Sequence, residues 1–300
     1  MSISHYIKDI GRGRDGARAL DRAQAADLMG QVLDGQVTDL ELGAFCIAMR
    51  IKGETDQEMA GFLDATHARL QLVHASSPVV VLPSYNGARK LPVLTPLLAH
   101  LLAREGLAVV MHGTPTESTR VTSQEVLAAM GVAPLKQANA VKAGEVVFVP
   151  TEVLCPGLKR LLDVRRVVGL RNPAHSLVKL MNPTTKPDAL LVSSYTHPEY
   201  AISMAATFEL TGARTLLLRG TEGEVVADAR RTPWVDAFVR GTRTPLVKAQ
   251  TGSLGQLPEL PTNIDASTTA RYTHAVLHGE LPVPAPLAAQ VHAVLKALSL

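Results

Sequence analysis

The chain of 300 residues has few cysteines, few aromatic side chains and no long apolar segment. Its two cysteines, Cys46 and Cys155, cannot form a disulfide framework, and their apolar surroundings predict buried, reduced thiols. The N-terminus is polar, and no apolar run reaches the roughly 18 residues that span a bilayer. We therefore expect a cytoplasmic protein that makes no membrane contact.

Net charge is also small, because 30 basic and 27 acidic residues leave only +3. This value alone does not indicate a nucleic-acid-binding protein. Its distribution is more informative: from Pro156 to Pro187 there are seven basic residues and one acid, Asp163. A basic segment inside a mildly acidic chain is a localised electrostatic feature that predicts an anionic partner.

The hydrophobic pattern predicts an α/β protein with two domains. Residues 1–75 are typical of helices, and Thr38 and Thr55 each begin a capping box with a glutamate three residues later. From Pro78, β-branched runs alternate with helical stretches, which predicts a mostly parallel central sheet. We predict a small N-terminal helical domain (1–75, joined in space by helices from about 156–185) and a larger α/β domain (76–300). The expected strands are 79–82, 108–111, 145–149, 189–193 and 215–218, and the tail from 252 is Pro-rich up to a last helix at 287–298.

Ligands of parallel sheets bind beyond the carboxyl ends of the strands, here at loops 83–90, 112–120 and 194–198. In the first loop, Arg89 and Lys90 are candidates for phosphate contact, although adjacent basic residues are also common in solvated turns. The second loop carries several hydroxyls and Arg120 ahead of a capped helix. Such a loop suits an anion, or it caps only its own helix.

The densest charge lies between Leu158 and Leu180, where leucines and a valine separate two basic pairs. This pattern predicts a helix with an apolar seam and a basic face able to neutralise several backbone phosphates; the alternative is a solvated helix face. Aromatic residues are scattered, and only Tyr85 lies in a predicted cleft loop. We therefore expect contacts mainly to the phosphate backbone, with little sequence specificity.

Taken in the order of the chain, these segments resemble the anthranilate phosphoribosyltransferase fold, which is shared with the type II nucleoside phosphorylases (glycosyltransferase family 3). Residues 40–45 resemble the family's small helical domain. His112-Gly113 followed by Ser118 resembles its lysine-His-Gly-Asn and serine-rich loop. The stretch from Val164 to Pro183 is similar to its arginine-bearing segment.

The chain departs from the motifs of this family at two places. The family's Gly-Thr-Gly-Gly-Asp pyrophosphate loop falls on Pro83–Gly87, with no residue retained in place, and its magnesium-holding Asp-Glu pair falls on Val225 and Val226. Phosphoribosyl transfer needs both, because the metal stabilises the pyrophosphate leaving group. We therefore expect no transferase activity, no catalytic residue, no cofactor and no metal.

Residues 164–180 are similar to one non-catalytic branch of this superfamily, the YbiB-type DNA-binding proteins. The resemblance implies a homodimer, formed through the helical domain, that binds DNA. The choice between DNA and RNA, and between single- and double-stranded partners, stays open. The candidate contact residues are Arg89, Lys90, Arg120, Lys159, Arg160, Arg165, Arg166, Arg171 and Lys179.

Two alternatives remain open. An enzyme of the same fold would act on a phosphorylated sugar or nucleotide, using Ser118, Arg120 and the Glu222 and Glu224 carboxylates with magnesium. A scaffold would instead present the basic segment to an acidic protein partner.

Overall fold

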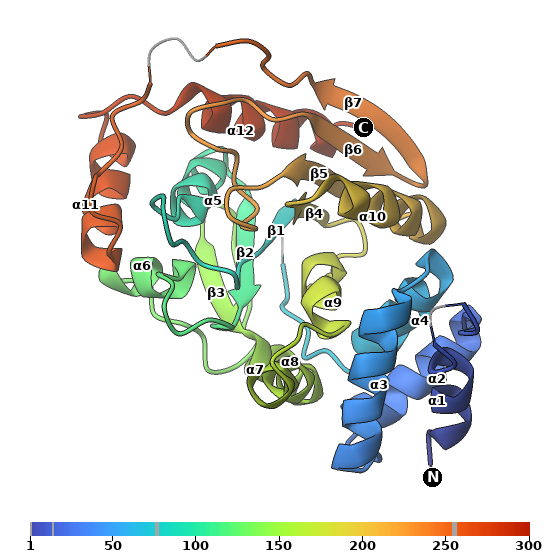
Figure 1. Ribbon diagram of the computed structural model, residues 1–300. Coiled ribbons are helices and arrows are strands. Elements are labelled where there is room, and N and C mark those ends of the chain that lie inside the picture. Colours follow the sequence, from blue (N-terminus) through green and yellow to red (C-terminus); the bar gives the residue numbers. More distant parts are fainter. Residues whose placement is uncertain (1, 14, 76–77, 254–256) are drawn as a thin grey trace. The chain divides into compact units, whose positions relative to one another are not determined.

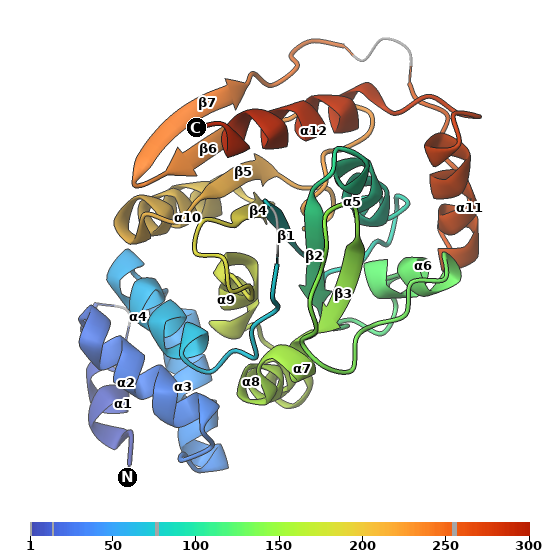
Figure 2. The same ribbon diagram turned by 180° about the vertical axis from the view of Figure 1, so that it is seen from behind.

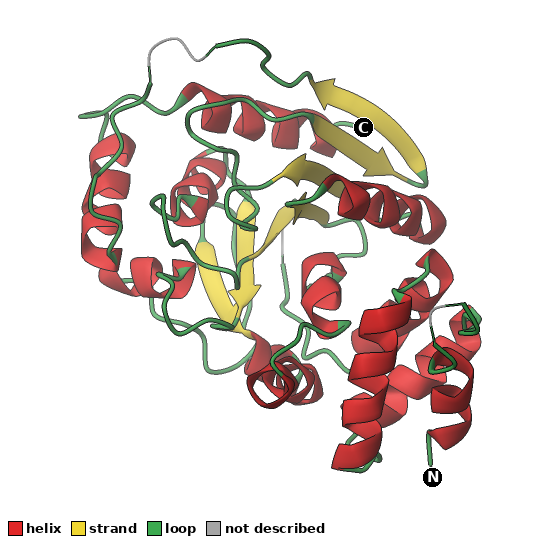
Figure 3. Cartoon of the chain, in the orientation of Figure 1, coloured by secondary structure: helices red, strands yellow, loops and turns green. Residues whose placement is uncertain are grey.

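A computed structural model of the chain describes residues 2–13, 15–75, 78–253 and 257–300. It divides into two compact units (Figure 1). Unit 1 comprises Met1–Gln71 and Thr151–Pro183, and unit 2 comprises Leu72–Pro150 and Thr184–Leu300. All of the strands lie in unit 2, whereas unit 1 is built from helices and loops within the described residues (Figure 3). The structure thus confirms the predicted fold class.

The helices of unit 1 are α1 (Ser4–Ile10), α2 (Arg22–Leu33), α3 (Asp39–Lys52), α4 (Asp56–His67), α7 (Thr151–Leu154), α8 (Pro156–Val168) and α9 (Ala174–Leu180). The two predicted capping boxes are confirmed: Thr38 accepts from the Glu41 N–H ahead of α3, and Thr55 accepts from the Glu58 N–H ahead of α4. Each box satisfies N–H groups that the first helical turn leaves without a partner. Both cysteines lie buried as free thiols, as expected.

Unit 2 has strands β1 (Val79–Pro83), β2 (Ala108–Gly113), β3 (Val146–Pro150), β4 (Leu190–Tyr195), β5 (Thr215–Arg219), β6 (Val235–Val239) and β7 (Thr242–Val247). Its helices are α5 (Thr95–Arg104), α6 (Ser123–Ala129), α10 (Pro198–Thr211), α11 (Ala266–Leu277) and α12 (Ala285–Leu298). The sheet order is β3-β2-β1-β4-β5-β6-β7, with parallel pairing from β3 to β5 and antiparallel pairing beyond. The carboxyl ends of β1, β2, β4 and β5 therefore share one edge.

The sequence pattern missed β6, β7 and α11. Pro245 lies within β7, the edge strand of the sheet, where proline is tolerated. Because proline is rare in strands, its presence argued against a strand in the sequence pattern. The tail from residue 252, expected to be irregular up to its last helix, contains α11 because its prolines flank that helix rather than interrupt it.

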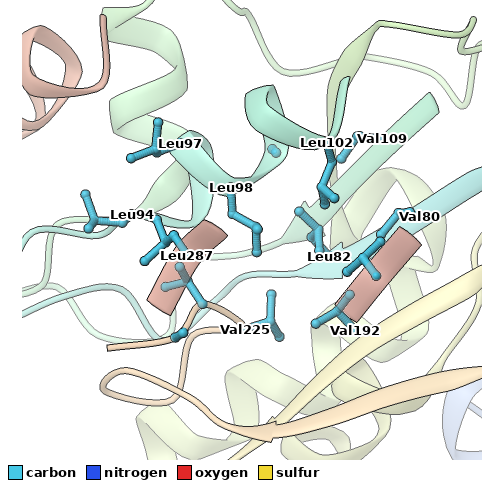
Figure 4. Close-up of a cluster of buried hydrophobic side chains, with 14 of the residues drawn as sticks. Val80, Leu82, Leu94, Leu97, Leu98, Leu102, Val109, Val192, Val225 and Leu287 are labelled. Carbon is cyan, nitrogen blue, oxygen red and sulfur yellow. The ribbon is translucent and has the colours of Figure 1, made fainter. Parts of the chain in front are cut away.

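The core of unit 2 forms between the sheet and helices α5 and α12 (Figure 4). Alternate strand residues point into it, including Val80, Val109 and Val192, and Leu98 and Leu287 meet them from the helices. Helix α10 packs on the opposite face of the sheet, visible from both sides in Figures 1 and 2. With both faces covered, ligand access is left to the strand ends. Each helix within the described residues is too short or too polar to cross a bilayer.

Candidate nucleic-acid interface

Residues 84–91, hereafter the cleft loop, follow β1 and are joined by backbone hydrogen bonds to the end of β2 and to the loop after it. The Ser84 N–H donates to the His112 carbonyl over 2.7 Å. Ala88 and Val121 exchange a pair of N–H···O bonds of 2.8 and 3.0 Å. Two of the three loops expected to bind a ligand are therefore held together at the carboxyl edge of the sheet.

Glu224 fills the inside of the cleft loop with its own carboxylate. The residue is only 1% exposed. Its oxygens accept from the backbone N–H groups of Asn86 (3.0 Å) and Gly87 (2.8 Å) and from the hydroxyls of Ser84, Thr95 (3.1 Å) and Ser123 (3.5 Å). Converging N–H and O–H donors of this kind make an anion site. In this chain the anion that occupies it is a side chain of the same chain.

Glu222 makes a second contact of the same type, two residues earlier. One carboxylate oxygen accepts from the consecutive N–H groups of Arg89, Lys90 and Leu91, at 3.0, 3.1 and 3.2 Å. Burial opposes ionisation of this carboxyl, but the three N–H donors and the charge of Arg120 outweigh it and lower the pKa of Glu222. The residue adopts φ 54°, a left-handed conformation that costs free energy outside glycine. The contacts with the cleft loop compensate for that cost.

These two carboxylates determine how the cleft loop presents its positive charge. Its N–H groups point inward to Glu222 and Glu224, while the side chains of Arg89 and Lys90 are exposed. Arg120 lies against the same loop, with its guanidinium 3.5 Å from the Asn86 carbonyl. Three of the candidate residues are thus brought together, all within unit 2.

One sequence expectation for these loops, the display of Tyr85, is corrected. Tyr85 is only 4% exposed, so its ring cannot stack on a base; it is packed beneath the loop rather than displayed by it. His112 is fully buried, and burial lowers its pKa to about 3, so the imidazole is neutral and cannot attract an anion by charge. Ser118, in contrast, is exposed.

The other six candidates lie in unit 1, on α8 and the chain that follows it. The predicted helix is confirmed, with Leu158, Leu161 and Leu162 buried on its apolar side. The only acid of the segment, Asp163, pairs with two cations: Lys159, and Arg166 at 3.5 Å. One carboxylate cannot neutralise both, so a net positive charge remains on the helix.

Arg160 has a structural contact within unit 1. Its guanidinium donates to the carbonyls of Val32 (2.8 Å) and Leu33 (3.3 Å) at the end of α2, where helices leave carbonyl groups without partners. Arg171 is exposed, and Arg165 and Lys179 are half-buried. The segment therefore mixes cations used to hold helices together with cations displayed to solvent.

The carboxylates do not fit a magnesium site. Glu222 and Glu224 accept from N–H and O–H groups, and a cation at the same oxygens would face the hydrogens of those donors. Val225 and Val226, where the resemblance places the metal-holding pair, are each 1% exposed and belong to the core. Over the described part of the chain, there is no group of three or more His, Cys, Asp or Glu side chains that could hold a metal ion.

Sequence reasoning missed one further group at this edge. Tyr195, Arg219 and Trp234 come from the ends of β4 and β5 and from the residue before β6. Only the antiparallel pairing of β6 with β5 brings Trp234 there, and β6 was not predicted.

The chain is similar over almost its whole length to known proteins of one superfamily. Residues 4–69 match the family described as glycosyl transferase family, helical bundle domain. The uncharacterized protein YbiB of Escherichia coli (strain K12) is 41% identical over 299 residues, which cover 97% of this chain and 92% of that protein.

More distant relatives are enzymes by name. The anthranilate phosphoribosyltransferase of Methanopyrus kandleri is 27% identical over 292 residues, covering 93% of this chain and 84% of the enzyme. Among solved structures, that of anthranilate phosphoribosyltransferase from Thermus thermophilus matches with a TM-score of 0.73 at 23% identity, covering 95% of this chain and 85% of the enzyme. At that identity the likeness shows the fold.

Proposed function

The chain belongs to the YbiB family within the anthranilate phosphoribosyltransferase superfamily, and on this premise we propose that it binds DNA through phosphate contacts. The binding has little sequence preference and involves no phosphoribosyl transfer. The partner is recognised by its chemistry, a polyanion with regularly spaced phosphates, which single- and double-stranded DNA and RNA all provide.

The cleft loop carries this proposal. The donors that could cradle a small phosphate ester already bind Glu222 and Glu224. The same contacts leave the Arg89 and Lys90 side chains exposed. A loop whose N–H donors are already bound by carboxylates of the same chain, and whose cationic side chains are exposed, is poorly suited to a small phosphorylated substrate. It is well suited to a phosphate backbone that passes over its surface.

The basic segment of unit 1 adds further cations. Arg166 has a side chain 66% exposed, and Arg171 is exposed as well. Each cation that meets a phosphate releases condensed counterions, so binding through such residues weakens as salt rises. Contacts to phosphates carry no base information, which accounts for the proposed lack of sequence preference.

The proposed assembly is a homodimer formed through α3. Its outer face carries an apolar stripe in which Leu40 is 84% exposed and Ile51 is 61% exposed. Half-buried Ala44 and Ile47 lie between them at helical spacing. The pattern i, i+4, i+7, i+11 is that of a helix that packs against another helix, so the occupant we propose is α3 of a second copy. Two basic surfaces on one dimer would raise avidity for a long polyanion.

The alternative enzyme would need Glu222 and Glu224 as magnesium ligands, together with Ser118 and Arg120. The fold shared with anthranilate phosphoribosyltransferase supports this alternative. Its test is binding of a phosphoribosyl compound that depends on magnesium and is lost in Glu222→Ala. Such a result would favour the enzyme over the DNA-binding protein.

Salt dependence tests the proposed function directly. Anisotropy of a fluorescein-labelled oligonucleotide should give an affinity that falls roughly a thousandfold from about 50 to 200 mM salt if six or more phosphates are contacted. The triple variant Arg89→Ala, Lys90→Ala, Arg120→Ala should reduce the slope of log affinity against log salt by about 2–3. Arg230→Ala is the matched control, because Arg230 is an exposed arginine of the same unit, paired with Asp228. A flat salt response of the wild type would overturn the proposal.

A further inference from the structure

The carboxyl edge of β4 and β5 gathers aromatic and cationic side chains beside the start of β6. Tyr195 pairs in register with Arg219 at the ends of β4 and β5. Leu218 pairs with Val235, so Trp234, the preceding residue, comes opposite Arg219 across the antiparallel pair. Residues from three neighbouring strands therefore meet at the edge where parallel sheets bind ligands.

These side chains lie on the same face of the sheet. Asp236 is two residues after Trp234 and so points to the same side. Burial raises the pKa of Tyr195, the charge of Asp236 raises it further, and the charges of Arg219 and Arg243 act in the opposite direction. All of these groups are therefore near the Tyr195 hydroxyl.

The indole of Trp234 is held in place through its polar atom. Its Nε1–H donates to one oxygen of Asp236 over 2.8 Å, and the other oxygen accepts from Arg243 over 2.7 Å. Asp236 is 3% exposed, whereas Trp234 remains 38% exposed. The guanidinium of Arg243 also lies 5.8 Å from the Phe238 ring centroid, which anchors this network to the sheet. A ring fixed before its ligand arrives loses little conformational entropy on binding.

A tryptophan in this state is suited to a flat ligand. Its single donor is already satisfied by Asp236, so the rest of the ring has no polar requirement left, and the residue is partly exposed. The exposed Arg219 beside it can contact a phosphate or the ring of the ligand. The cleft loop follows β1, which pairs directly with β4 in the same unit, so the proposed phosphate contacts Arg89 and Lys90 lie in the loop after the neighbouring strand.

We propose that Trp234, flanked by Tyr195 and Arg219, is a stacking site for an unpaired nucleobase. The inference rests on the proposed function and adds a base contact to it. The ligand is a nucleotide in a single-stranded segment, because the bases of an intact duplex already cover each other's faces. The site distinguishes single-stranded from double-stranded partners without reading sequence, since every base has a π surface.

The experiment uses the full chain and its single tryptophan. Indole emission, excited where tyrosine does not absorb, and anisotropy of a fluorescein-labelled oligothymidine are measured in the same titration. We expect quenching that follows single-strand binding, and no quenching with a duplex of equal length. Trp234→Leu should weaken binding of the oligothymidine by roughly 5- to 150-fold and leave duplex binding unchanged. Trp234→Phe, which keeps an aromatic ring, should recover most of the affinity.

The outcomes separate this inference from the function on which it rests. If the oligonucleotide binds with steep salt dependence, but indole emission does not change and Trp234→Leu binds like the wild type, the stacking site is wrong and the DNA-binding function stands. An equal loss of duplex affinity in Trp234→Leu would also overturn the site. If neither polynucleotide binds, the proposed function itself fails.

Discussion

The strongest prediction concerns Glu224, whose carboxylate organises the inside of the cleft loop. Replacing it with leucine removes the acceptor of two buried N–H groups, those of Asn86 and Gly87. An orphaned buried donor costs about 1–3 kcal/mol, so the variant should lose about 2–6 kcal/mol of unfolding free energy. The hydroxyls add less, because they can rotate to other acceptors: the Ser84 and Ser123 hydroxyl oxygens lie 2.7 Å apart and can bond to each other.

Glu224→Gln separates the hydrogen bonds from the charge. The amide oxygen can still accept from both N–H groups, but neutral hydrogen bonds are weaker than those to a carboxylate. We expect a loss of about 1–2 kcal/mol, smaller than that of the leucine variant. An unfolding free energy that decreases from the wild type to Glu224→Gln and then to Glu224→Leu is therefore what we expect of a carboxylate that satisfies buried donors.

Urea unfolding followed by Trp234 emission is the assay, because this single tryptophan lies in the same unit as the cleft loop. Glu259→Leu, which removes an exposed carboxylate of that unit, controls for the change of side chain and should stay within about 0.5 kcal/mol of the wild type. A Glu224→Leu protein as stable as this control would refute the assignment of Glu224 as the internal anion of the loop.

Two further predictions concern Glu222 and the proposed dimer. Because the pKa of Glu222 is lowered in the folded chain, its contribution to the unfolding free energy is complete above its ordinary value of 4.5 and is lost as the pH falls through the lowered value. Glu222→Gln should therefore flatten the acid limb of stability against pH, and superimposable curves for the two proteins would contradict this linkage. Leu40→Asp with Ile51→Asp should convert a dimer to a folded monomer in light scattering after gel filtration, because both side chains are exposed within one chain. The control Leu257→Asp, at an exposed leucine of unit 2, should keep the mass of the dimer. A monomeric wild type, or an unchanged mass in the double variant, would contradict the proposed α3 interface.

The sequence by itself determined the structural features that depend on residues only a few positions apart in the chain. The capping boxes at Thr38 and Thr55 join groups three residues apart, so the residue types alone locate the helix starts. The apolar strands of the parallel sheet and the basic helix α8 were predictable for the same reason, since period and composition are local. The resemblance to a known superfamily also followed from motif order along the chain.

Only the tertiary structure decided what those elements do at the candidate site. Glu224 and Asn86 meet across 138 positions, and no local pattern states that a carboxylate will fill a distant loop. Tyr85 lies in a loop, where exposure is the rule, yet packing buries it. Trp234 reaches the carboxyl edge through the pairing of β6 with β5, and the sequence pattern did not predict β6. Long-range contacts depend on which surfaces pack together, and that is a property of the folded chain as a whole.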